Sequence, residues 1–537
     1  MRKVIVPTIQ NVGRSARVSG VPASLVCETN GTPRGQSRDP LLHVIQLMLP
    51  PLSALSTRLS CALAPAAFSW IVASFLGATA FVPSAGAADE LLLGNVTGEQ
   101  DFPSVLVMET GGYVVFEDNR VGSGKDGRGI SAVLLDSSLR ASGESFRVNQ
   151  VSLGKHERPQ IVALGGGKAL ALWEVRQGAK AGMYGRVLGT NGASAAGDLL
   201  LNVPTTKATI KQTVKWAAHY RGKWKTRTHK FKDIISNTRE QAGAVAAASL
   251  PDGGAVLVYQ AIRRSETNSW TLVDETYVSR GKFLTNAVLR PTKATEDWMF
   301  DIFMQRLDAN GAKVGAEILV NQYANYNQRT PAVAVLENGN LAVVWVCEYP
   351  ASSDWRANFR VDLMGRIFNP QGEPVGDEFS VAASDSVAQA NPVVIGAVGG
   401  GFTVLWSQQE GAVSRNWDVY GRVFGLDGSA AGSAFRVNSH TTGDQFAPRA
   451  ASQGGRQLVV WTSVGQDGSR EGVYGRFLEN GVIDGEEFRI NDTTASRQFH
   501  PSLAPDGAGR ALVVWAGFSG ATGFDLFRRI MPLGGTE

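Results

Sequence analysis

One unit of about 55 residues recurs along the chain from residue 89 onward. Its best-preserved copy, residues 447–491, contains four short strand-like runs separated by glycine or Asn-Gly turns. The second run is apolar throughout and ends in an aromatic residue, the third reads VYGRF and the fourth reads EFRIN. Short runs of this kind, joined by tight turns, are typical of an antiparallel β-meander. The chain is therefore predicted to be an all-β repeat protein.

Two independent markers each count seven copies of the unit. A proline opens the first run in six copies, and Gly243 takes that place in the third copy. An aromatic residue closes the second run in every copy. The prolines are Pro103, Pro159, Pro331, Pro392, Pro448 and Pro501. The aromatic residues are Phe116, Trp173, Tyr259, Trp345, Trp406, Trp461 and Trp515.

The seventh copy lacks a fourth run, and a matching run lies at the other end of the repeats. The third run of the last copy is residues 525–530, after which the chain ends. Residues 90–95, ELLLGN, precede Pro103 at the spacing that separates each fourth run from the next proline. This permutation predicts a seven-bladed β-propeller of four-stranded blades, with the last blade closed by the N-terminal strand. An open array of β-sandwiches is the alternative, but such an array gains nothing from a permuted strand.

The first 88 residues differ in composition from the repeats. Residues 61–82 are apolar, and Ala85, Gly86 and Ala87 follow as small residues suited to signal peptidase. We therefore expect a leader at 1–87 with a helical signal segment, a start near Met48 and cleavage before Ala88. The remaining residues, 88–537, would form the propeller of an exported protein, periplasmic or extracellular, with no membrane span. An uncleaved membrane anchor is the alternative, because about 20 apolar residues can cross a bilayer.

The leader accounts for the basic character of the whole chain. The formal net charge is +4, but residues 1–88 hold seven basic and two acidic residues, so the rest carries −1. A nucleic-acid partner is therefore not expected. Of the three cysteines only Cys347 lies beyond the leader, which excludes an intrachain disulfide in the propeller.

The repeats resemble a known class of exported bacterial proteins. Residues 419–438, VYGRVFGLDGSAAGSAFRVN, and residues 301–321, DIFMQRLDANGAKVGAEILVN, are similar to the "YGQRFD…G.EF.VN" repeats of some haemolysin-type surface proteins. The resemblance implies a repeat fold, and it implies no specific activity. The glycine-aspartate nonapeptide that binds calcium in the haemolysin type is missing, as are the WD40 signature and the sialidase Asp box. Neither calcium nor those two classes is therefore indicated.

Two long insertions interrupt the third copy, at residues 203–242 and 260–300. One precedes the first run and the other separates the second run from the third. In a four-stranded meander these two connections lie at the same end of the blade. Each exceeds its counterparts by roughly 30 residues, and connections that long are usually functional or disordered. We call the two insertions together the crest, and we expect them to lie side by side over the third blade.

The crest combines cationic and aromatic side chains. Residues 207–240 hold ten basic and two acidic residues. Basic groups attract anions, and flat aromatic groups stack on sugar rings or bases. The candidate ligand-binding residues of the crest are Lys215, Trp216, Lys223, Trp224, Lys225, Arg227, Trp270 and Trp298. The alternative is a β-hairpin whose aromatic residues pack on the second insertion while its lysines remain solvated.

Other recurring polar residues have a structural interpretation. Arginine recurs in the third run at Arg186, Arg366, Arg422, Arg476 and Arg529, and we expect it to bridge neighbouring blades. A ring of Gln100, His156, Gln328, Gln389, Gln445 and Gln498, with Glu240 in the third copy, is expected to hydrogen-bond around the rim. His156 and His500 are further ligand-binding candidates at the channel mouth. The histidine spacing indicates no metal site, and no cofactor is expected.

Three functions are compatible with these features. The first is a non-catalytic module that binds an anionic polysaccharide or surface polymer through the crest. The second is an enzyme, such as a lyase, acting on acidic polysaccharide. Its catalytic candidates are His219, Tyr220, Arg221 and His229, because proton abstraction needs a base with a pKa near the working pH. The third is a structural scaffold that offers its face to a protein partner.

Overall fold

The computed structural model describes residues 90–534, except 95, 122–127, 151–153, 177–181, 193–196, 203–205, 221–222, 280–281, 324–325, 351–358, 385–386, 398, 412–415 and 521. For most of 206–241 and 263–298 the description is limited to the backbone. The chain divides into Met1–Thr79 and Ala80–Glu537, and all described residues belong to the second unit. The predicted leader, its helix and its cleavage site lie outside the described residues. The described part contains no helix long and apolar enough to cross a membrane.

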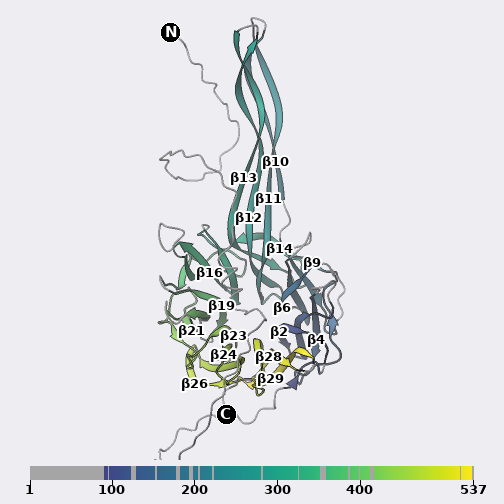
Figure 1. The fold of residues 1–537 in the computed structure, drawn as a ribbon, viewed down its shortest axis with the longest axis vertical. Helices are drawn as coiled ribbons and strands as arrows, with labels where there is room; N and C mark the ends of the chain where they lie inside the picture. The colour runs from purple at the N-terminus through teal and green to yellow at the C-terminus, as the bar shows by residue number, and fades with distance from the viewer. Residues whose placement is uncertain are drawn as a thin grey trace, which may run out of the picture. The chain divides into compact units, whose positions relative to one another are not determined.

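Seven antiparallel sheets form the fold, which confirms the predicted seven-bladed β-propeller (Figure 1). Blade 1 consists of β2 (Gln100–Met108), β3 (Gly111–Asp118), β4 (Gly129–Leu135) and β5 (Phe146–Arg147). Blade 2 consists of β6 (His156–Leu164), β7 (Lys168–Val175), β8 (Gly182–Leu188) and β9 (Leu199–Leu200). Blade 4 consists of β15 (Gln328–Val335), β16 (Leu341–Pro350), β17 (Phe359–Phe368) and β18 (Phe379–Ala382).

The remaining blades follow the same order of strands. Blade 5 consists of β19 (Gln389–Gly396), β20 (Phe402–Gln409), β21 (Trp417–Phe424) and β22 (Phe435–Arg436). Blade 6 consists of β23 (Gln445–Gln453), β24 (Arg456–Val464), β25 (Glu471–Glu479) and β26 (Val482–Arg489). Blade 7 consists of β27 (Gln498–Pro505), β28 (Arg510–Ser519), β29 (Gly523–Pro532) and the N-terminal β1 (Glu90–Leu91).

Strand β1 closes the ring as the sequence predicts. Glu90 pairs with Arg528 and Leu91 with Phe527, both in β29. The next residue, Leu92, donates its backbone N–H to the carbonyl of Leu526 at 2.8 Å and is buried. The seventh blade therefore receives its fourth, outermost strand from the start of the domain, which joins the two ends of the ring.

The first strand of each blade is innermost, because it contacts the first strands of the neighbouring blades. The apolar second strands pack between blades on both faces. One cluster joins Leu458 and Val460 of blade 6 to Val513 and Trp515 of blade 7. The closing tryptophans are completely or almost completely buried there: Trp173, Trp345, Trp406, Trp461 and Trp515. Burial of these large rings between blades adds to the apolar stabilisation that the second strands supply.

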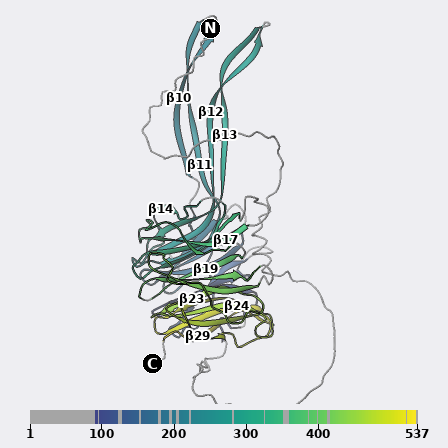
Figure 2. The ribbon, with the colours of Figure 1, turned by 90° about the vertical axis from the view of Figure 1, so that its left-hand side faces the viewer.

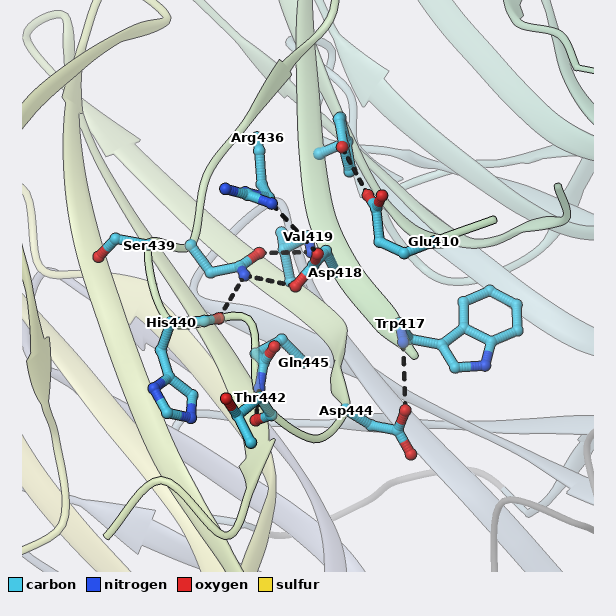
Figure 3. A network of polar contacts seen from close by, with 12 residues as sticks. Glu410, Trp417, Asp418, Val419, Arg436, Ser439, His440, Thr442, Asp444 and Gln445 are labelled. Atoms are coloured by element: carbon cyan, nitrogen blue, oxygen red, sulfur yellow. Dashed lines mark hydrogen bonds and ion pairs between the residues drawn. The ribbon is translucent and has the colours of Figure 1, made fainter. Parts of the chain in front are cut away.

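The asparagine that ends most fourth strands fixes the adjacent loop. In blade 5 the side chain of Asn438 accepts the N–H of Val419 at 2.7 Å and donates to Asp418 at 2.6 Å and to the His440 carbonyl at 2.8 Å (Figure 3). The same acceptor role is filled by Asn149, Asn202, Asn321 and Asn491 at 2.7–3.1 Å. The "VN" end of the repeat is thus a buried polar anchor.

The recurring arginines of the third strand join neighbouring blades, as predicted. Arg422 of blade 5 donates to the Val381 carbonyl of blade 4 at 3.1 Å, and Arg476 of blade 6 donates to the Val437 carbonyl of blade 5 at 2.8 Å. Arg186, Arg366 and Arg529 make the equivalent contact. Recurrence in five blades identifies this arginine as structural.

Blade 3 differs from the others because its strands continue into the crest (Figures 1 and 2). Its sheet contains β10 (Thr206–Tyr220), β11 (Lys223–Ser249), β12 (Ala255–Ser279), β13 (Lys282–Leu307) and β14 (Lys313–Leu319). The first insertion is the β10–β11 hairpin, and the second is the extension of the β12–β13 hairpin. They pair directly with each other, from Ile234 with Asn268 to Glu240 with Ile262. Both insertions are therefore regular β-structure continuous with the blade.

Candidate functional site

A ring of strained residues surrounds the propeller axis on the side of the crest. Each innermost strand contains a bulge whose central residue has a φ between 43° and 54°. The seven residues, which we call the inner rim, are Phe102, Arg158, Ala244, Thr330, Asn391, Ala447 and His500. Positive φ is unfavourable for residues other than glycine and persists only where the surroundings enforce it.

The inner rim corrects one detail of the repeat alignment. In six blades the residue after the positive φ is the opening proline. In blade 3 the residue with positive φ is Ala244, so Val245 occupies the proline position and Gly243 does not. A Cβ atom on Gly243 would lie 2.9 Å from the Glu174 carboxylate, so a larger residue there would require that side chain to shift. The same shift removes Glu240 from the predicted polar ring.

Side chains of one blade hold the bulge of the next. Glu117 of blade 1 accepts the backbone N–H of Arg158 at 2.8 Å, and Glu174 of blade 2 accepts that of Ala244. Gln260 of blade 3 accepts the N–H of Thr330 at 3.0 Å. In blade 5, Ser407 does the same for Ala447 at 3.0 Å. These hydrogen bonds satisfy the buried amides that the bulges leave unpaired.

Blades 1 and 2 place paired carboxylates directly next to the inner rim. Asp101 lies opposite Glu117 in the strand register, and Glu157 lies opposite Glu174. Burial raises the pKa of Glu117 to about 7, and the charge of Asp101 adds to this effect. The Arg158 N–H and the Arg128 guanidinium, 2.9 Å away, act in the opposite direction but do not overcome burial. Like charges at this depth favour protonation of one partner.

His500 is the one histidine of the inner rim, and a carboxylate orients it. Its Nδ1 lies 2.7 Å from Asp101 Oδ1, and its ring stacks on Phe102 with the centroids 3.8 Å apart. The side chain is 20% exposed. His156 lies in a different place: it is 1% exposed, beside Trp173, and burial lowers its pKa. The structure thus presents His500 at the mouth and keeps His156 inside blade 2.

The side chains of the predicted polar ring are buried within the blades. Gln100, Gln328, Gln389, Gln445 and Gln498 are all buried, at positions equivalent to His156. Gln328 accepts the indole N–H of Trp345 at 3.0 Å. Gln445 donates to the Thr442 carbonyl at 3.1 Å (Figure 3). These contacts fit the structural role expected from the sequence. At the described positions, no three His, Cys, Asp or Glu side chains gather as a metal site requires.

The register of the β10–β11 hairpin shows on which face of the hairpin each basic residue lies. Residues paired across an antiparallel ladder share a face, and alternate residues along a strand change face. One face, which we call the lysine face, therefore carries Lys207, Lys211, Lys215, Lys230 and Lys232. The positions of Lys207 and Lys215 are about 26 Å apart at ~3.3 Å per residue. Lys211, Thr228 and Lys230, whose side chains are described, all belong to this face and are all exposed.

The opposite face of this hairpin combines basic and aromatic positions. Trp216 pairs with Arg227, Ala218 with Lys225 and Tyr220 with Lys223. The predicted ligand-binding residues of the first insertion are therefore divided between faces, with Lys215 and Trp224 on the lysine face. In the second insertion Trp270 pairs with Pro291, and Trp298 lies at the irregularity between the Ile262 and Arg264 pairings.

The catalytic candidates are distributed along the hairpin. His219 pairs with Trp224 and Tyr220 with Lys223, both next to the tip. His229 pairs with Val214, five positions further from the tip than His219, which is about 17 Å along the strand. Arg221 lies outside the described residues. His219 and Tyr220 are neighbours in sequence but lie on opposite faces of the hairpin, and His229 lies away from both along the strand.

Comparisons with known proteins give only distant structural likenesses. No protein-family model matches the sequence, and no curated protein does either. Similar solved structures include a protein of unknown function from Dyadobacter fermentans (11% identity, TM-score 0.42, 71% of this chain and 95% of that chain). A polysaccharide lyase (9%, 0.44, 82% and 91%) and an α-L-arabinanase from Penicillium chrysogenum complexed with arabinobiose (12%, 0.35, 70% and 92%) are also similar. At these identities the likeness does not extend to ligand or activity.

Proposed function

We propose that this protein is an exported ligand-binding propeller that recognises an anionic polysaccharide or cell-surface polymer through the crest. The observation that carries the proposal is the lysine face, where five lysines follow one side of the β10–β11 hairpin and no acidic residue shares that side between Lys207 and Ser236. Like charges in a row repel one another, and a bound anion relieves this repulsion. At the Lys207 end of the row, Glu266 shares the face through its pairing with Ser236.

The shape of the lysine face favours a polymer over a small ligand. Its lysines are spread over about 26 Å, which is too far for one small anion to contact them together. A linear chain with repeated acidic groups can contact them in sequence, and several weak contacts then add to a useful affinity.

The charge of the rest of the propeller favours the approach of an anionic polymer to the crest. Residues 207–240 have a net charge of +8, whereas the other residues after 88 have a net charge of −9. An anionic polymer is therefore attracted to the crest and repelled elsewhere, which orients its approach. Aromatic positions beside cations, such as Trp216 opposite Arg227, supply flat surfaces for sugar rings.

A binding assay with matched variants tests the proposal. Lys211→Gln/Lys230→Gln removes two exposed charges from the lysine face. Lys168→Gln/Lys313→Gln removes two charges from strands that begin at the opposite end of the blades. Against alginate, heparin and neutral dextran, we expect the wild type to bind the two acidic polymers, and the crest variant to lose about tenfold in affinity. The control variant should bind like the wild type.

Two results would count against the proposal. Equal affinities for the two variants would show that the lysine face is not the contact surface. Tighter binding to double-stranded DNA than to either acidic glycan would indicate a different polymer class. Formation of an unsaturated uronide, followed by its ultraviolet absorbance, would favour the lyase alternative, and its loss in Tyr220→Phe would place that reaction at the tip. Export is tested separately by N-terminal sequencing of the secreted protein, which should begin at Ala88.

A further inference from the structure

A row of five aromatic rings lies where blade 7 meets blade 1, on the side of the crest. The centroid of the His500 ring lies 3.8 Å from that of Phe102 and 4.4 Å from that of Phe499. Phe499 meets Phe524 edge-on at 5.1 Å, and Phe524 meets Phe518 in the same way at 5.5 Å. Each ring therefore contacts the next. We call these five residues the aromatic row.

The aromatic row reaches solvent. Phe518 is 41% exposed, and the other four rings are half-buried. Deeper in the blades the apolar contact continues, because Ala516 and Leu526 of blade 7 belong to one core cluster with Val105 of blade 1. The row is thus the part of this interface that water reaches. Apolar rings gathered at a surface are a common sign of a binding site.

The fold of a blade does not require aromatic residues at these positions. Phe499 follows the buried Gln498, and Phe518 follows the residue that pairs with Gln498 in the ladder. The register places an ion pair at the same two positions in blades 2 and 4, namely Glu157 with Arg176 at 3.2 Å and Arg329 with Glu348 at 3.3 Å. The phenylalanines are therefore a feature of blade 7 that the repeat does not explain.

His500 brings a polar atom into the aromatic row. Asp101 Oδ1 accepts the Phe102 N–H at 2.7 Å and lies 2.7 Å from His500 Nδ1. Because this oxygen acts as an acceptor, Nδ1 carries the proton, and the lone pair of the neutral imidazole lies on Nε2. Among the described residues Nε2 has no hydrogen-bond partner, and it is not sealed from water. An acceptor is therefore available beside the phenylalanine rings.

We propose that the aromatic row is a sugar-binding site. The apolar face of a sugar ring packs on Phe518 and Phe524, and a hydroxyl of the same glycan donates to His500 Nε2. A sugar ring suits this surface because it combines a face of C–H groups with a rim of hydroxyls. An apolar protein partner suits it less, because covering the row would leave Nε2 desolvated without a partner. The site is independent of the lysine face.

Titration calorimetry of the full chain with cellohexaose, mannohexaose and xylohexaose tests this site. These probes carry no charge, so the lysine face does not attract them. Phe518→Ala removes the most exposed ring, and Val482→Ala removes a 67% exposed apolar side chain from β26 as the control. We expect the wild type and Val482→Ala to bind at least one probe, and Phe518→Ala to lose about tenfold in affinity. No binding by the wild type, or equal affinities in the two variants, would overturn the proposal.

His500→Asn tests the polar atom separately. Asn391 occupies the equivalent position of the inner rim in blade 5 with a φ of 52°, so asparagine fits this backbone. Its amide can donate to Asp101 in place of Nδ1, but the variant lacks Nε2. We expect it to melt like the wild type and to bind the sugar about tenfold more weakly. Unchanged affinity would overturn the role of His500.

Further measurements separate this site from the function proposed for the crest. Lys211→Gln/Lys230→Gln should bind the neutral probes like the wild type. If Phe518→Ala also weakens binding of polymeric alginate, one chain contacts both sites; if it does not, the aromatic row takes a separate glycan. Sedimentation checks the remaining occupant. A wild type that is dimeric, with a monomeric Phe518→Ala variant, would overturn the proposal because a second copy then covers the row.

Discussion

The backbone N–H of Arg158 in blade 2 donates to the carboxylate of Glu117 in blade 1 at 2.8 Å. This contact joins two blades and holds a residue with positive φ, so it links the closure of the ring to the strain at the inner rim. Glu117 is 2% exposed, and burial raises its pKa to about 7. A structural contact of the fold is thus sensitive to pH near neutrality.

The stability of the propeller should decrease as the pH rises from about 4.5 to about 7. Glu117 keeps its proton in the folded state over this range and loses it when unfolded, so folding takes up a proton. The contribution is fully present below the unfolded pKa and is lost above the folded one. For a rise from 4.5 to about 7 it amounts to about 3–4 kcal/mol at ~1.4 kcal/mol per pKa unit. Glu117→Gln should remove this pH dependence, because an amide side chain does not titrate in this range. The fold should be kept, since the amide oxygen can still accept the Arg158 N–H, as Gln260 does for Thr330.

Melting temperatures measured at pH 5 and pH 8 check this expectation. Glu479→Gln, at an exposed turn, serves as the control and should keep the wild-type difference between the two pH values. An unchanged pH dependence in Glu117→Gln would show that another group is responsible.

Asn438→Ala should destabilise blade 5 strongly. The substitution leaves the Val419 N–H and the buried Asp418 carboxylate without the amide that now satisfies both. Unsatisfied buried groups of this kind cost about 1–3 kcal/mol each. Blade 4 carries Ala382 in the same place, and there Asp362 is paired with Arg360 at 2.6 Å instead. Chemical denaturation of Asn438→Ala beside the exposed Asn310→Ala should show a loss of a few kcal/mol for the first variant, and a comparable loss in both would argue against the anchor.

Leu92→Ala should weaken the closure of the ring. Leu92 is 4% exposed and packs with Val105, Leu526 and other apolar residues of blades 1 and 7. A buried leucine replaced by alanine costs about 2–5 kcal/mol. Leu200→Ala, in the outer strand of blade 2 where the side chain is 43% exposed, is the matched control. Thermal unfolding should show a clear decrease for Leu92→Ala and little change for Leu200→Ala; the reverse order would mean that β1 does not carry the closure.

Binding of an acidic polymer to the crest should depend steeply on salt. Each lysine that contacts the polymer displaces a condensed cation, so the logarithm of the affinity falls linearly with the logarithm of the salt concentration. Lys211→Gln/Lys230→Gln should reduce this slope by about two, at roughly one per lysine. Titrations at several sodium chloride concentrations measure the slope, and a slope identical to that of the wild type would exclude contact at these two lysines.

Much of the architecture was predictable from the sequence, because short-range features of each repeat specify its strands and turns. The prolines, the closing aromatic residues and the glycine turns each reflect a local conformation that a few neighbouring residues set. Seven copies can therefore be counted in the sequence. The run at residues 90–95 also predicts that the ring is closed, since the seventh copy of the repeat has no fourth run of its own. The structural role of the third-strand arginines followed from their recurrence in five blades, which a single active site would not show.

The inner rim was not predictable in the same way. Its bulges depend on contacts between blades that are about 40 to 70 residues apart in sequence, such as Ala447 with Ser407 and Thr330 with Gln260. The assignment of Gly243 to the proline position was wrong for this reason, because only the ladder shows that Ala244 carries the positive φ. Both His156 and His500 were expected at the channel mouth, but one is buried beside Trp173 and the other meets Asp101 across 399 positions.

The sequence by itself determined the number of blades, the strand that seals them and the site of the two insertions, because turn chemistry and apolar periodicity act over a few residues. The tertiary structure decided which charges meet. It brought His500 to Asp101 across 399 positions and placed five lysines on one side of a hairpin. Ring closure and strand register are long-range properties, and the energy of a charge depends on what the rest of the fold places around it.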